Sequence, residues 1–451
     1  MGMPLSGTDD TRPAVLAAGG EVSRGALAQR ARMLAAAVDA HPARRWALVC
    51  DDAGWFAAGL LALASRRRTM VLPQAPQAGS LAAAGIEVDA VLTDRPGDFA
   101  GYATLAAREN ELLADDCQPQ DDAKIEFYTS GSSGAPKCVP KTYAQLRREV
   151  EALERQWGAA LGTAAVAGTV PHYHLYGLLF RVLWPLYAGR PIHAALCQQP
   201  ADLRAVAIKT PFILVSSPAF LSRAGLDELP SASRVAGLFS SGAPLPDDTA
   251  RALKRDWGRA AVEVYGSTET GGVAWRAWTD AESRPWWQPI GGTEVDLREE
   301  EAGPRLWVRS GCTWEEDWMP TGDLARTSTD GRFALLGRAD DVLKFEDKRV
   351  SLSEMRGRLL QHTWVADARL LLLPGKRALI GAVVVLKPDG RAALDASGKL
   401  AMNESLRAWL RQSYEALLLP RKWRFPETLP DNAMGKTEQA RLLALFGGDE
   451  A

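Results

Sequence analysis

Thr129-Ser130-Gly131-Ser132-Ser133-Gly134-Ala135-Pro136-Lys137 is the stretch of this chain that says most about its fold. It comes after an apolar segment, residues 125–128, that has the texture of a buried strand. Its glycines let a ligand approach the backbone closely, and its hydroxyls, backbone N–H groups and lysine suit phosphate oxygens. The common NTPase pattern G-x-x-x-x-G-K-[ST] is absent. The run predicts a loop that holds a polyphosphate, with a solvated linker as the alternative.

The composition bounds the class of protein. The 451 residues are enough for two or three domains with ample cores, and a hydrophobic share of 47% is ordinary for a globular protein. The formal net charge of −2 gives no reason to expect nucleic-acid binding. Residues 341–451, however, carry 18 Lys and Arg against 14 Asp and Glu. This mildly basic C-terminal part could face an acidic partner, or could simply be a solvated surface.

Targeting and redox features are few. The five cysteines are widely spaced and form no metal-ligand pattern, so we expect no disulfide framework. The segment from Met1 to Arg12 has no signal-peptide pattern, and no uncharged apolar run reaches the ~18 residues of a membrane span. The sequence therefore predicts a cytoplasmic protein without a membrane span.

Short apolar runs alternate with helical stretches along the first part of the chain. Helices are expected at residues 54–63 and after Thr142, which is a plausible N-cap. Strands are expected at residues 46–50, 90–93, 212–215, 237–239 and 262–264. A repeat of strand, Ser/Gly loop and helix is typical of an open α/β sheet that binds ligands at the carboxyl ends of its strands.

The texture changes after Gly291. Expected strands at residues 305–308 and 332–336 indicate a β-rich segment. Residues 341–451 have the pattern of a small α+β domain, with strands at 370–373 and 382–386 and a helix at 403–415.

Four further motifs lie downstream of the Ser/Gly run. They are Tyr265-Gly266-Ser267-Thr268-Glu269-Thr270, Thr321-Gly322-Asp323, Gly337-Arg338-Ala339-Asp340-Asp341 and Asn432-Ala433-Met434-Gly435-Lys436. With residues 129–137, this ordered set resembles the adenylate-forming superfamily of acyl-CoA synthetases, nonribosomal adenylation domains and luciferases. The resemblance implies a large N-terminal domain, residues 1–339, of two open α/β sheets plus a β-rich subdomain. It also implies a small mobile α+β C-terminal domain, residues 340–451, with its hinge at Asp340.

The resemblance further implies ATP and Mg²⁺ as cofactors, with a role for each motif. The β- and γ-phosphates would be held by Thr129, Ser130, Gly131, Ser132, Ser133, Gly134 and Lys137. The adenine side would be formed by Gly242, Ala243, Pro244, Tyr265, Gly266 and Ser267, with the tyrosine stacked on the base. Thr268 would donate to the α-phosphate, and Glu269 would bind Mg²⁺ through a hard oxygen. Asp323 would accept from the ribose hydroxyls, and Arg338 would support the ribose or a phosphate.

Each of these residues taken alone has a simpler interpretation. Tyr265 could be a core aromatic at the end of an apolar strand, and Glu269 could cap a following helix. Asp323 could make a turn, and Arg338 could form a surface ion pair. The order and spacing of the whole set favour the functional roles.

The reaction that the resemblance implies joins two anions, because a carboxylate attacks the α-phosphate of ATP to give an acyl-adenylate and pyrophosphate. Such a site needs positive charge and in-line positioning. By resemblance, Lys436 supplies a mobile point charge to the carboxylate and α-phosphate; a solvated loop lysine is the alternative. His174 matches the histidine of the family's Pro-x-Phe-His-x-x-Gly element and would border the acyl pocket. His172 has no such counterpart, and its role, chemical or structural, stays open.

Residues 170–191 resemble the stand-alone synthetases of aryl-polyene and xanthomonadin pigment clusters. This narrower resemblance implies an aromatic, hydroxybenzoate-like acid and an acyl carrier protein as acceptor. Asp347 stands where acyl-CoA synthetases have a glycine beside the pantetheine tunnel, which argues against ordinary CoA chemistry. An acidic carrier protein could dock on basic residues of the C-terminal domain. The candidates are Arg356, Arg358, Arg421, Lys422 and Arg424.

Three other functions stay open. An aryl- or medium-chain acyl-CoA synthetase that uses free CoA is the main alternative. A luciferase-like oxygenase would have the same fold and a different reaction, and a non-catalytic relative would only bind ligands.

Overall fold

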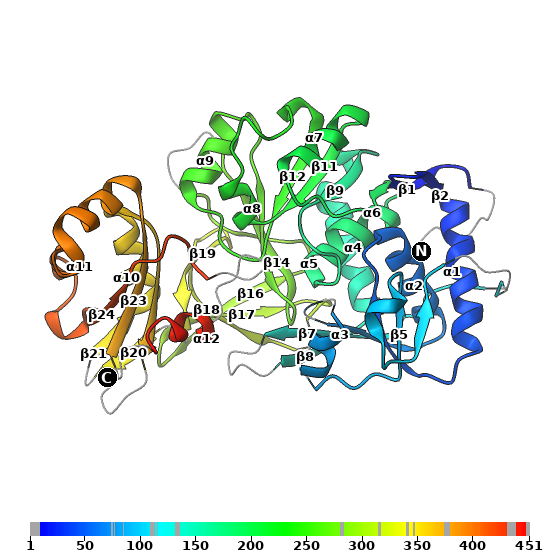
Figure 1. Ribbon diagram of the computed structural model, residues 1–451, viewed down its shortest axis with the longest axis horizontal. Helices are drawn as coiled ribbons and strands as arrows, with labels where there is room; N and C mark the ends of the chain where they lie inside the picture. Colours follow the sequence, from blue (N-terminus) through cyan, green and yellow to red (C-terminus); the bar gives the residue numbers. More distant parts are fainter. Residues whose placement is uncertain are drawn as a thin grey trace. The chain divides into compact units, whose positions relative to one another are not determined.

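Two mixed β-sheets and the helices packed on them make up most of the N-terminal part of the chain (Figure 1). The structure is a computed structural model that describes residues 10–447, apart from residues 74, 76, 84, 109–112, 115, 131–135, 280–283, 314–316, 340–341, 346–347, 374–378 and 431–438. Its contacts divide the chain into two compact units. The first comprises Met1–Glu294 and Val308–Met319, and the second comprises Val295–Trp307 and Pro320–Ala451. The predicted α/β class is confirmed.

The first sheet of the first unit has six strands in the order β6-β5-β3-β4-β7-β8. They are β3 (Arg45–Val49), β4 (Thr69–Leu72), β5 (Ala90–Thr93), β6 (Thr104–Ala106), β7 (Lys124–Ser130) and β8 (Pro136–Thr142). Neighbouring strands are parallel, except that β7 and β8 form an antiparallel pair. The helices of this region are α1 (Arg24–Asp39), α2 (Ala53–Ser65) and α3 (Ala78–Ala83).

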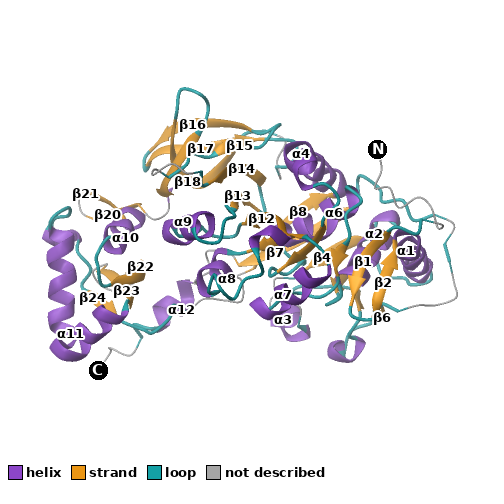
Figure 2. Ribbon diagram, turned by 90° about the horizontal axis from the view of Figure 1, so that it is seen from above, coloured by secondary structure: helices purple, strands orange, loops and turns teal. Residues whose placement is uncertain are grey.

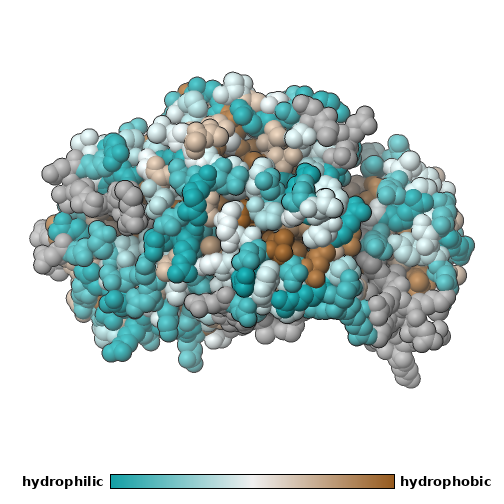
Figure 3. Space-filling view, turned by 180° about the vertical axis from the view of Figure 1, so that it is seen from behind, coloured by the Kyte–Doolittle hydropathy of each residue, from teal (hydrophilic) through white to brown (hydrophobic). Residues whose placement is uncertain are grey.

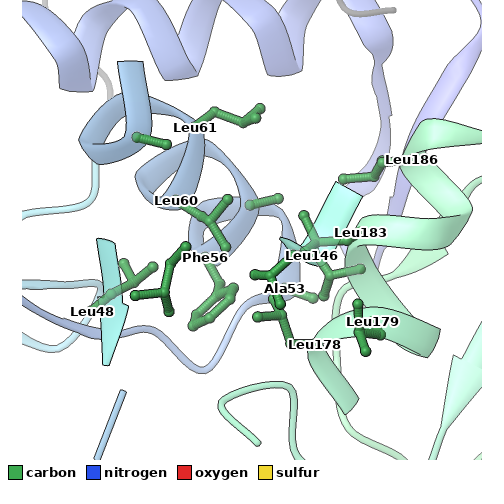
Figure 4. Close-up of a cluster of buried hydrophobic side chains, with 14 of the residues drawn as sticks. Leu48, Ala53, Phe56, Leu60, Leu61, Leu146, Leu178, Leu179, Leu183 and Leu186 are labelled. Atoms are coloured by element: carbon green, nitrogen blue, oxygen red, sulfur yellow. The ribbon is translucent and has the colours of Figure 1, made fainter. Parts of the chain in front are cut away.

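Helix α2 is apolar around its circumference, as expected of a helix that has no face in water. The Asp52 side chain caps it by accepting hydrogen bonds from the N–H groups of Gly54 (2.8 Å) and Trp55 (3.0 Å). Phe56 and Leu60 of α2 lie among leucines from β3, α4 and the helical segment that contains Leu178–Leu183 (Figure 4). Helix α2 is therefore part of the main hydrophobic core of the first unit.

The second sheet of the first unit has nine strands in the order β15-β14-β13-β12-β11-β9-β10-β1-β2. They are β1 (Pro13–Ala17), β2 (Gly20–Ser23), β9 (Ala165–Gly168), β10 (Ile192–His193), β11 (Phe212–Ser216), β12 (Val235–Ser240), β13 (Val262–Ser267), β14 (Gly271–Ala277) and β15 (Gln288–Pro289). The helices are α4 (Tyr143–Leu161), α5 (Leu175–Gly177), α6 (Trp184–Tyr187), α7 (Pro200–Lys209), α8 (Pro218–Arg223) and α9 (Asp247–Arg255). Strands β11 and β12 lie beside α7, α8 and α9 (Figure 1).

Most expected elements of the first unit are present, including the helix that Thr142 caps. The Thr142 side chain and Gln145 form a reciprocal capping box at the start of α4. Strand β8 was not expected: it pairs antiparallel with β7 and precedes α4. The Tyr265 motif is likewise followed by an antiparallel strand, β14, so the alternative in which Glu269 caps a following helix is wrong.

The second unit contains most of a four-stranded sheet and a three-stranded sheet. The first has the order β16-β17-β18-β19, with β16 (Glu294–Glu300), β17 (Gly303–Arg309), β18 (Met319–Thr327) and β19 (Phe333–Arg338). The second has the order β22-β23-β24, with β22 (Val365–Leu373), β23 (Leu379–Leu386) and β24 (Lys422–Arg424). A hairpin of β20 (Val342–Phe345) and β21 (Lys348–Ser351) precedes the three-stranded sheet. The expected domain boundary between residues 339 and 340, with its hinge at Asp340, stays a prediction.

Both faces of the three-stranded sheet are covered by helices, as Figure 2 shows. Ile380, Ala382 and Val384 of β23 belong to the core that includes α10 (Leu352–Leu360) and α11 (Pro388–Arg411), whereas Val383 contacts α12 (Gln439–Ala444). Alternate residues of β23 thus face opposite sides of the sheet, as the two-residue period of a strand requires. The expected helix at 403–415 is the second half of α11, whose backbone breaks at Gly398 (φ +77°).

The molecular face in Figure 3 is mainly hydrophilic, with a small hydrophobic patch. Within the described part of the chain, no helix has the length and apolar character that a bilayer crossing requires.

Candidate active site

The β7–β8 hairpin presents the first predicted motif. Thr129 and Lys137 are partners in the antiparallel register, and the Thr129 hydroxyl donates to the Lys137 carbonyl (3.4 Å). The Lys137 side chain is half-exposed. Gly131, Ser132, Ser133 and Gly134 lie outside the described residues, as does the side chain of Ser130. The hairpin thus fixes Lys137 at the base of the predicted phosphate loop.

The second motif forms the turn between β13 and β14. The Ser267 N–H donates to the Thr270 hydroxyl (3.0 Å), and the Thr270 N–H donates back to the Ser267 hydroxyl (3.1 Å). Gly266 and Gly271 pack so closely that a Cβ on Gly266 would overlap the Gly271 carbonyl. Gly271 also has a φ of +72°, which favours glycine. These constraints hold Thr268 and Glu269 on a compact, partly exposed turn.

The two motifs meet in an ion pair. The Lys137 Nζ atom lies 2.7 Å from the Glu269 Oε1 atom, although the residues are far apart in sequence. Partial burial by itself raises the pKa of Glu269. The hydrogen bond and charge of Lys137, together with hydrogen bonds from the Glu269 backbone N–H and from Ser267, outweigh it and leave that pKa below its usual range. Glu269 is therefore ionised at neutral pH, in the state that a hard cation requires.

A third loop, residues 241–245, lies against the same strand β13. The Ser241 hydroxyl donates to the Val264 carbonyl (2.8 Å), which fixes the loop to the strand. Gly242 has a φ of +96°, and residues 242–244 are exposed. Tyr265 is half-buried, and its ring centroid lies 5.6 Å from that of Trp287. The structure thus brings the predicted adenine residues onto one strand and its neighbouring loop.

A buried ion pair beneath this region was not predicted. Arg276 makes two hydrogen bonds to Glu263, of 2.8 and 2.7 Å, and the two side chains are 4% and 3% exposed. Glu263 also accepts from the Leu245 N–H (3.3 Å), and the Arg276 guanidinium lies 4.3 Å from the ring centroid of Trp287. The available signal was a single charge inside the apolar run 262–264.

The structure distinguishes the two histidines. His172 is buried, its Nε2 atom lies 2.8 Å from the Cys50 carbonyl, and its ring packs on Phe56. Burial lowers the pKa of His172 to about 3, so the ring is neutral and its structural role is favoured. His174 is half-buried at the N-terminus of α5, beside the Tyr173 ring.

The predicted ribose residues lie together in the second unit. Asp323 on β18 and Arg338 on β19 are partners in the antiparallel register. The Asp323 N–H donates to the Thr321 hydroxyl (3.1 Å), and that hydroxyl donates to the Leu306 carbonyl (2.9 Å). A Cβ on Gly322 would overlap the Arg338 guanidinium. Lys436, Asp340 and Asp347 lie outside the described residues.

At least three of the five predicted docking cations have partners within the C-terminal region. Arg356 pairs with Asp367 (2.8 Å), and the Arg358 guanidinium lies 4.1 Å from the ring centroid of Trp409. Arg424 donates to the Leu445 carbonyl (2.7 Å). The side chain of Arg421 is exposed, and Lys422 is half-buried. The partnered arginines still carry charge, but they are less available to a protein partner.

Comparison with known proteins identifies the class that this fold and these motifs define. Residues 58–309 match the family described as AMP-binding enzyme. The chain therefore belongs to the AMP-binding enzyme family, and its predicted place among adenylate-forming enzymes is confirmed.

Relatives of the chain include CoA ligases. A 4-coumarate--CoA ligase from Rhodobacter capsulatus is 29% identical over 337 residues, which cover 74% of this chain and 79% of that protein. A benzoate--CoA ligase from Thauera aromatica is 26% identical over 393 residues, covering 78% and 71%. Other relatives are named for malonate and for long-chain fatty acids. The predicted enzyme class, an AMP-forming acid–thiol ligase, is confirmed.

A solved structure with the same fold contains nucleotide and metal. O-succinylbenzoate coenzyme A synthetase from Bacillus subtilis, in complex with ATP and magnesium ion, superposes with a TM-score of 0.78 at 18% identity and covers 96% of each chain. This similarity establishes the shared fold.

Proposed function

We propose that this enzyme activates an aromatic, hydroxybenzoate-like acid with ATP and transfers the acyl group to the phosphopantetheine thiol of an acyl carrier protein. In the first step a carboxylate oxygen forms a bond to the α-phosphorus, and the bond from that phosphorus to the pyrophosphate oxygen breaks. In the second step the thiol sulfur attacks the acyl carbon, its proton is lost, and AMP leaves.

One observation carries the first step: the 2.7 Å contact between Lys137 and Glu269. It joins the proposed phosphate-binding cation and the proposed metal-binding carboxylate, which come from two separate motifs. The described residues contain no cluster of three or more acidic, His or Cys side chains that could hold a metal alone. A single carboxylate nevertheless fits Mg²⁺, which commonly keeps one or two protein carboxylates and takes its other ligands from water and nucleotide phosphates. When bound, Mg²⁺ would neutralise charge that develops on the phosphates.

The remaining roles are assigned motif by motif. Lys137 and the loop 129–134 would hold the β- and γ-phosphates, Thr268 would donate to the α-phosphate, and Tyr265 would stack on adenine. Gly242, Ala243, Pro244, Gly266 and Ser267 would line the nucleotide, with Asp323 and Arg338 at the ribose. Lys436 would approach the reacting carboxylate after rotation about Asp340, and His174 would border the acyl group. The exposed Gly242 loop and the half-exposed Lys137 are accessible, as these roles require.

Free CoA is the second candidate acceptor, and the names of the relatives favour it. Asp347 and the basic balance of residues 341–451 favour the carrier protein.

Acid-dependent exchange of pyrophosphate into ATP tests the activation step. Aromatic hydroxy acids should support exchange better than fatty acids or malonate. Thioester formation is then compared between an acidic holo-carrier protein and free CoA. No exchange with any carboxylic acid would overturn the proposed function, whereas efficient CoA acylation without carrier loading would replace only the acceptor.

A further inference from the structure

Strand β8 carries a second lysine that contacts Glu269. Lys141 lies four residues after Lys137, so the period of two places both side chains on the same face of the strand. The Lys137 ammonium reaches the Glu269 carboxylate. The Lys141 ammonium donates to the Glu269 backbone carbonyl (3.3 Å) and to the Cys312 carbonyl (2.5 Å). The two lysines therefore hold the side chain and the peptide of one residue.

The two lysines differ in exposure. Lys137 is 47% exposed and can reach a ligand, whereas Lys141 is 2% exposed. Burial lowers the pKa of Lys141, and Glu149 and other nearby groups oppose this shift. A lysine that is buried against two carbonyls cannot itself contact a bound nucleotide. Its effect on the site must pass through the residues that it holds.

A buried carboxylate completes the arrangement. Glu149 on α4 is 4% exposed, and its Oε1 atom accepts a hydrogen bond from the Gly272 N–H (2.6 Å). Its other oxygen lies beside Gly271, because a Cβ built there would come within 2.8 Å of Oε2. Lys141 and Glu149 thus hold the β13–β14 turn at two points, Glu269 and Gly272, which lie on either side of its left-handed glycine.

We infer that Lys141 and Glu149 are positioning residues that fix the backbone of the β13–β14 turn so that the Glu269 carboxylate is set for a divalent cation. This inference rests on the proposed function, in which Glu269 is the metal ligand. Core packing does not explain these two buried charges, because burying a lysine without a partner is costly. The inference gives both charges a role. A small displacement of a catalytic group is expected to cost much activity.

The test measures how strongly Mg²⁺ enhances ATP binding. Calorimetry gives the dissociation constant of ATP at saturating Mg²⁺ and in EDTA, and the ratio of the two constants is compared among variants. Lys141→Met keeps the length of the side chain and removes its charge. We expect this ratio to fall about tenfold, equivalent to about 1.4 kcal/mol. Lys124→Met, which changes an exposed lysine on the adjacent strand β7, is the matched control and should leave the ratio unchanged.

Two further variants separate a positioning role from general damage. Glu149→Leu removes the acceptor for the Gly272 N–H and should lower the ratio in the same direction, which keeps the test valid if Lys141→Met does not fold. In a Glu269→Gln background, Lys141→Met should cause no further fall, because residues that act through one group are non-additive.

The outcomes are distinguishable. If Glu269→Gln leaves the ratio unchanged, the metal role in the proposed function fails. If Glu269→Gln lowers the ratio but folded Lys141→Met and Glu149→Leu behave like Lys124→Met, the positioning inference fails. Equal weakening of ATP binding with and without Mg²⁺ in those two variants would also overturn it.

Discussion

Removing Arg276 should destabilise the first unit far more than removing an exposed arginine of similar geometry. Arg276 makes two hydrogen bonds to Glu263, and both side chains are almost fully buried. In Arg276→Leu, the Glu263 carboxylate would lose both of these bonds and keep the longer one from the Leu245 N–H. An uncompensated buried charge of this kind costs about 3–5 kcal/mol, and loss of the contact with Trp287 adds up to about 1–2 kcal/mol.

Arg309 is the matched control for this prediction. It also makes two hydrogen bonds to a glutamate, Glu294, and its guanidinium lies 4.9 Å from the ring centroid of a tryptophan, Trp318. The side chains of this pair are 41% and 61% exposed, however. Solvent screens exposed pairs of this kind, so Arg309→Leu should cost far less stability than Arg276→Leu.

Urea unfolding with linear extrapolation measures both costs. The double variant Glu263→Leu with Arg276→Leu should recover much of the lost stability, because an apolar pair leaves no buried charge. If Arg276→Leu costs no more than Arg309→Leu, or the double variant is less stable than Arg276→Leu alone, the assigned energy of the buried pair is wrong.

Three other predictions concern pH and catalysis. The pKa of His172 is lowered to about 3 in the folded chain, so its contribution to stability is present above about pH 6.5 and is lost as pH falls. The loss is about 1.4 kcal/mol per pH unit until the pH nears 3. In His172→Gln, the free energy of unfolding should lack this part of its dependence on pH. Lys436→Ala should cut pyrophosphate exchange by about 3–4 kcal/mol in activation free energy while largely sparing thioester formation from a supplied adenylate, and equal loss in both assays would contradict its role. Changing Arg421 and Lys422 to Glu should slow carrier-protein loading and weaken its salt dependence without changing exchange; unchanged loading would remove this docking surface.

The sequence was most informative where a local pattern fixes a local structure. Thr142 was predicted as a helix N-cap, and the structure has it in a full capping box with Gln145. The apolar run at 54–63 likewise predicted a helix. The run at 262–264 predicted a strand but not the hairpin that this strand begins. The hairpin depends on close packing of Gly266 against Gly271, whereas the sequence pattern alone resembles a strand-to-helix loop.

Long-range contacts of the candidate site could not be predicted from such patterns. Motif order placed Lys137 and Glu269 in one site, but only the folded chain pairs them. No pattern around Lys141 indicated that its side chain would be buried. Glu149 lies three residues after Leu146 and so on the apolar face of α4, which was the one available signal of a buried charge. Its partners lie on β14, far along the chain, and no local rule identifies them.

The all-apolar helix α2 also has a consequence for synthesis of the chain. Its 13 residues include no charged side chain, so the helix has no charged face that could stay in water. The preceding helix α1 can cover part of it early, but Leu178 and Leu183, which lie against it in Figure 4, come later. They emerge from the ribosome roughly 110 residues after α2, which at about 5–20 residues per second is a delay on the order of 10 s. During that interval the nascent chain exposes an apolar surface that can aggregate, so its yield in cells should depend on ribosome-associated chaperones.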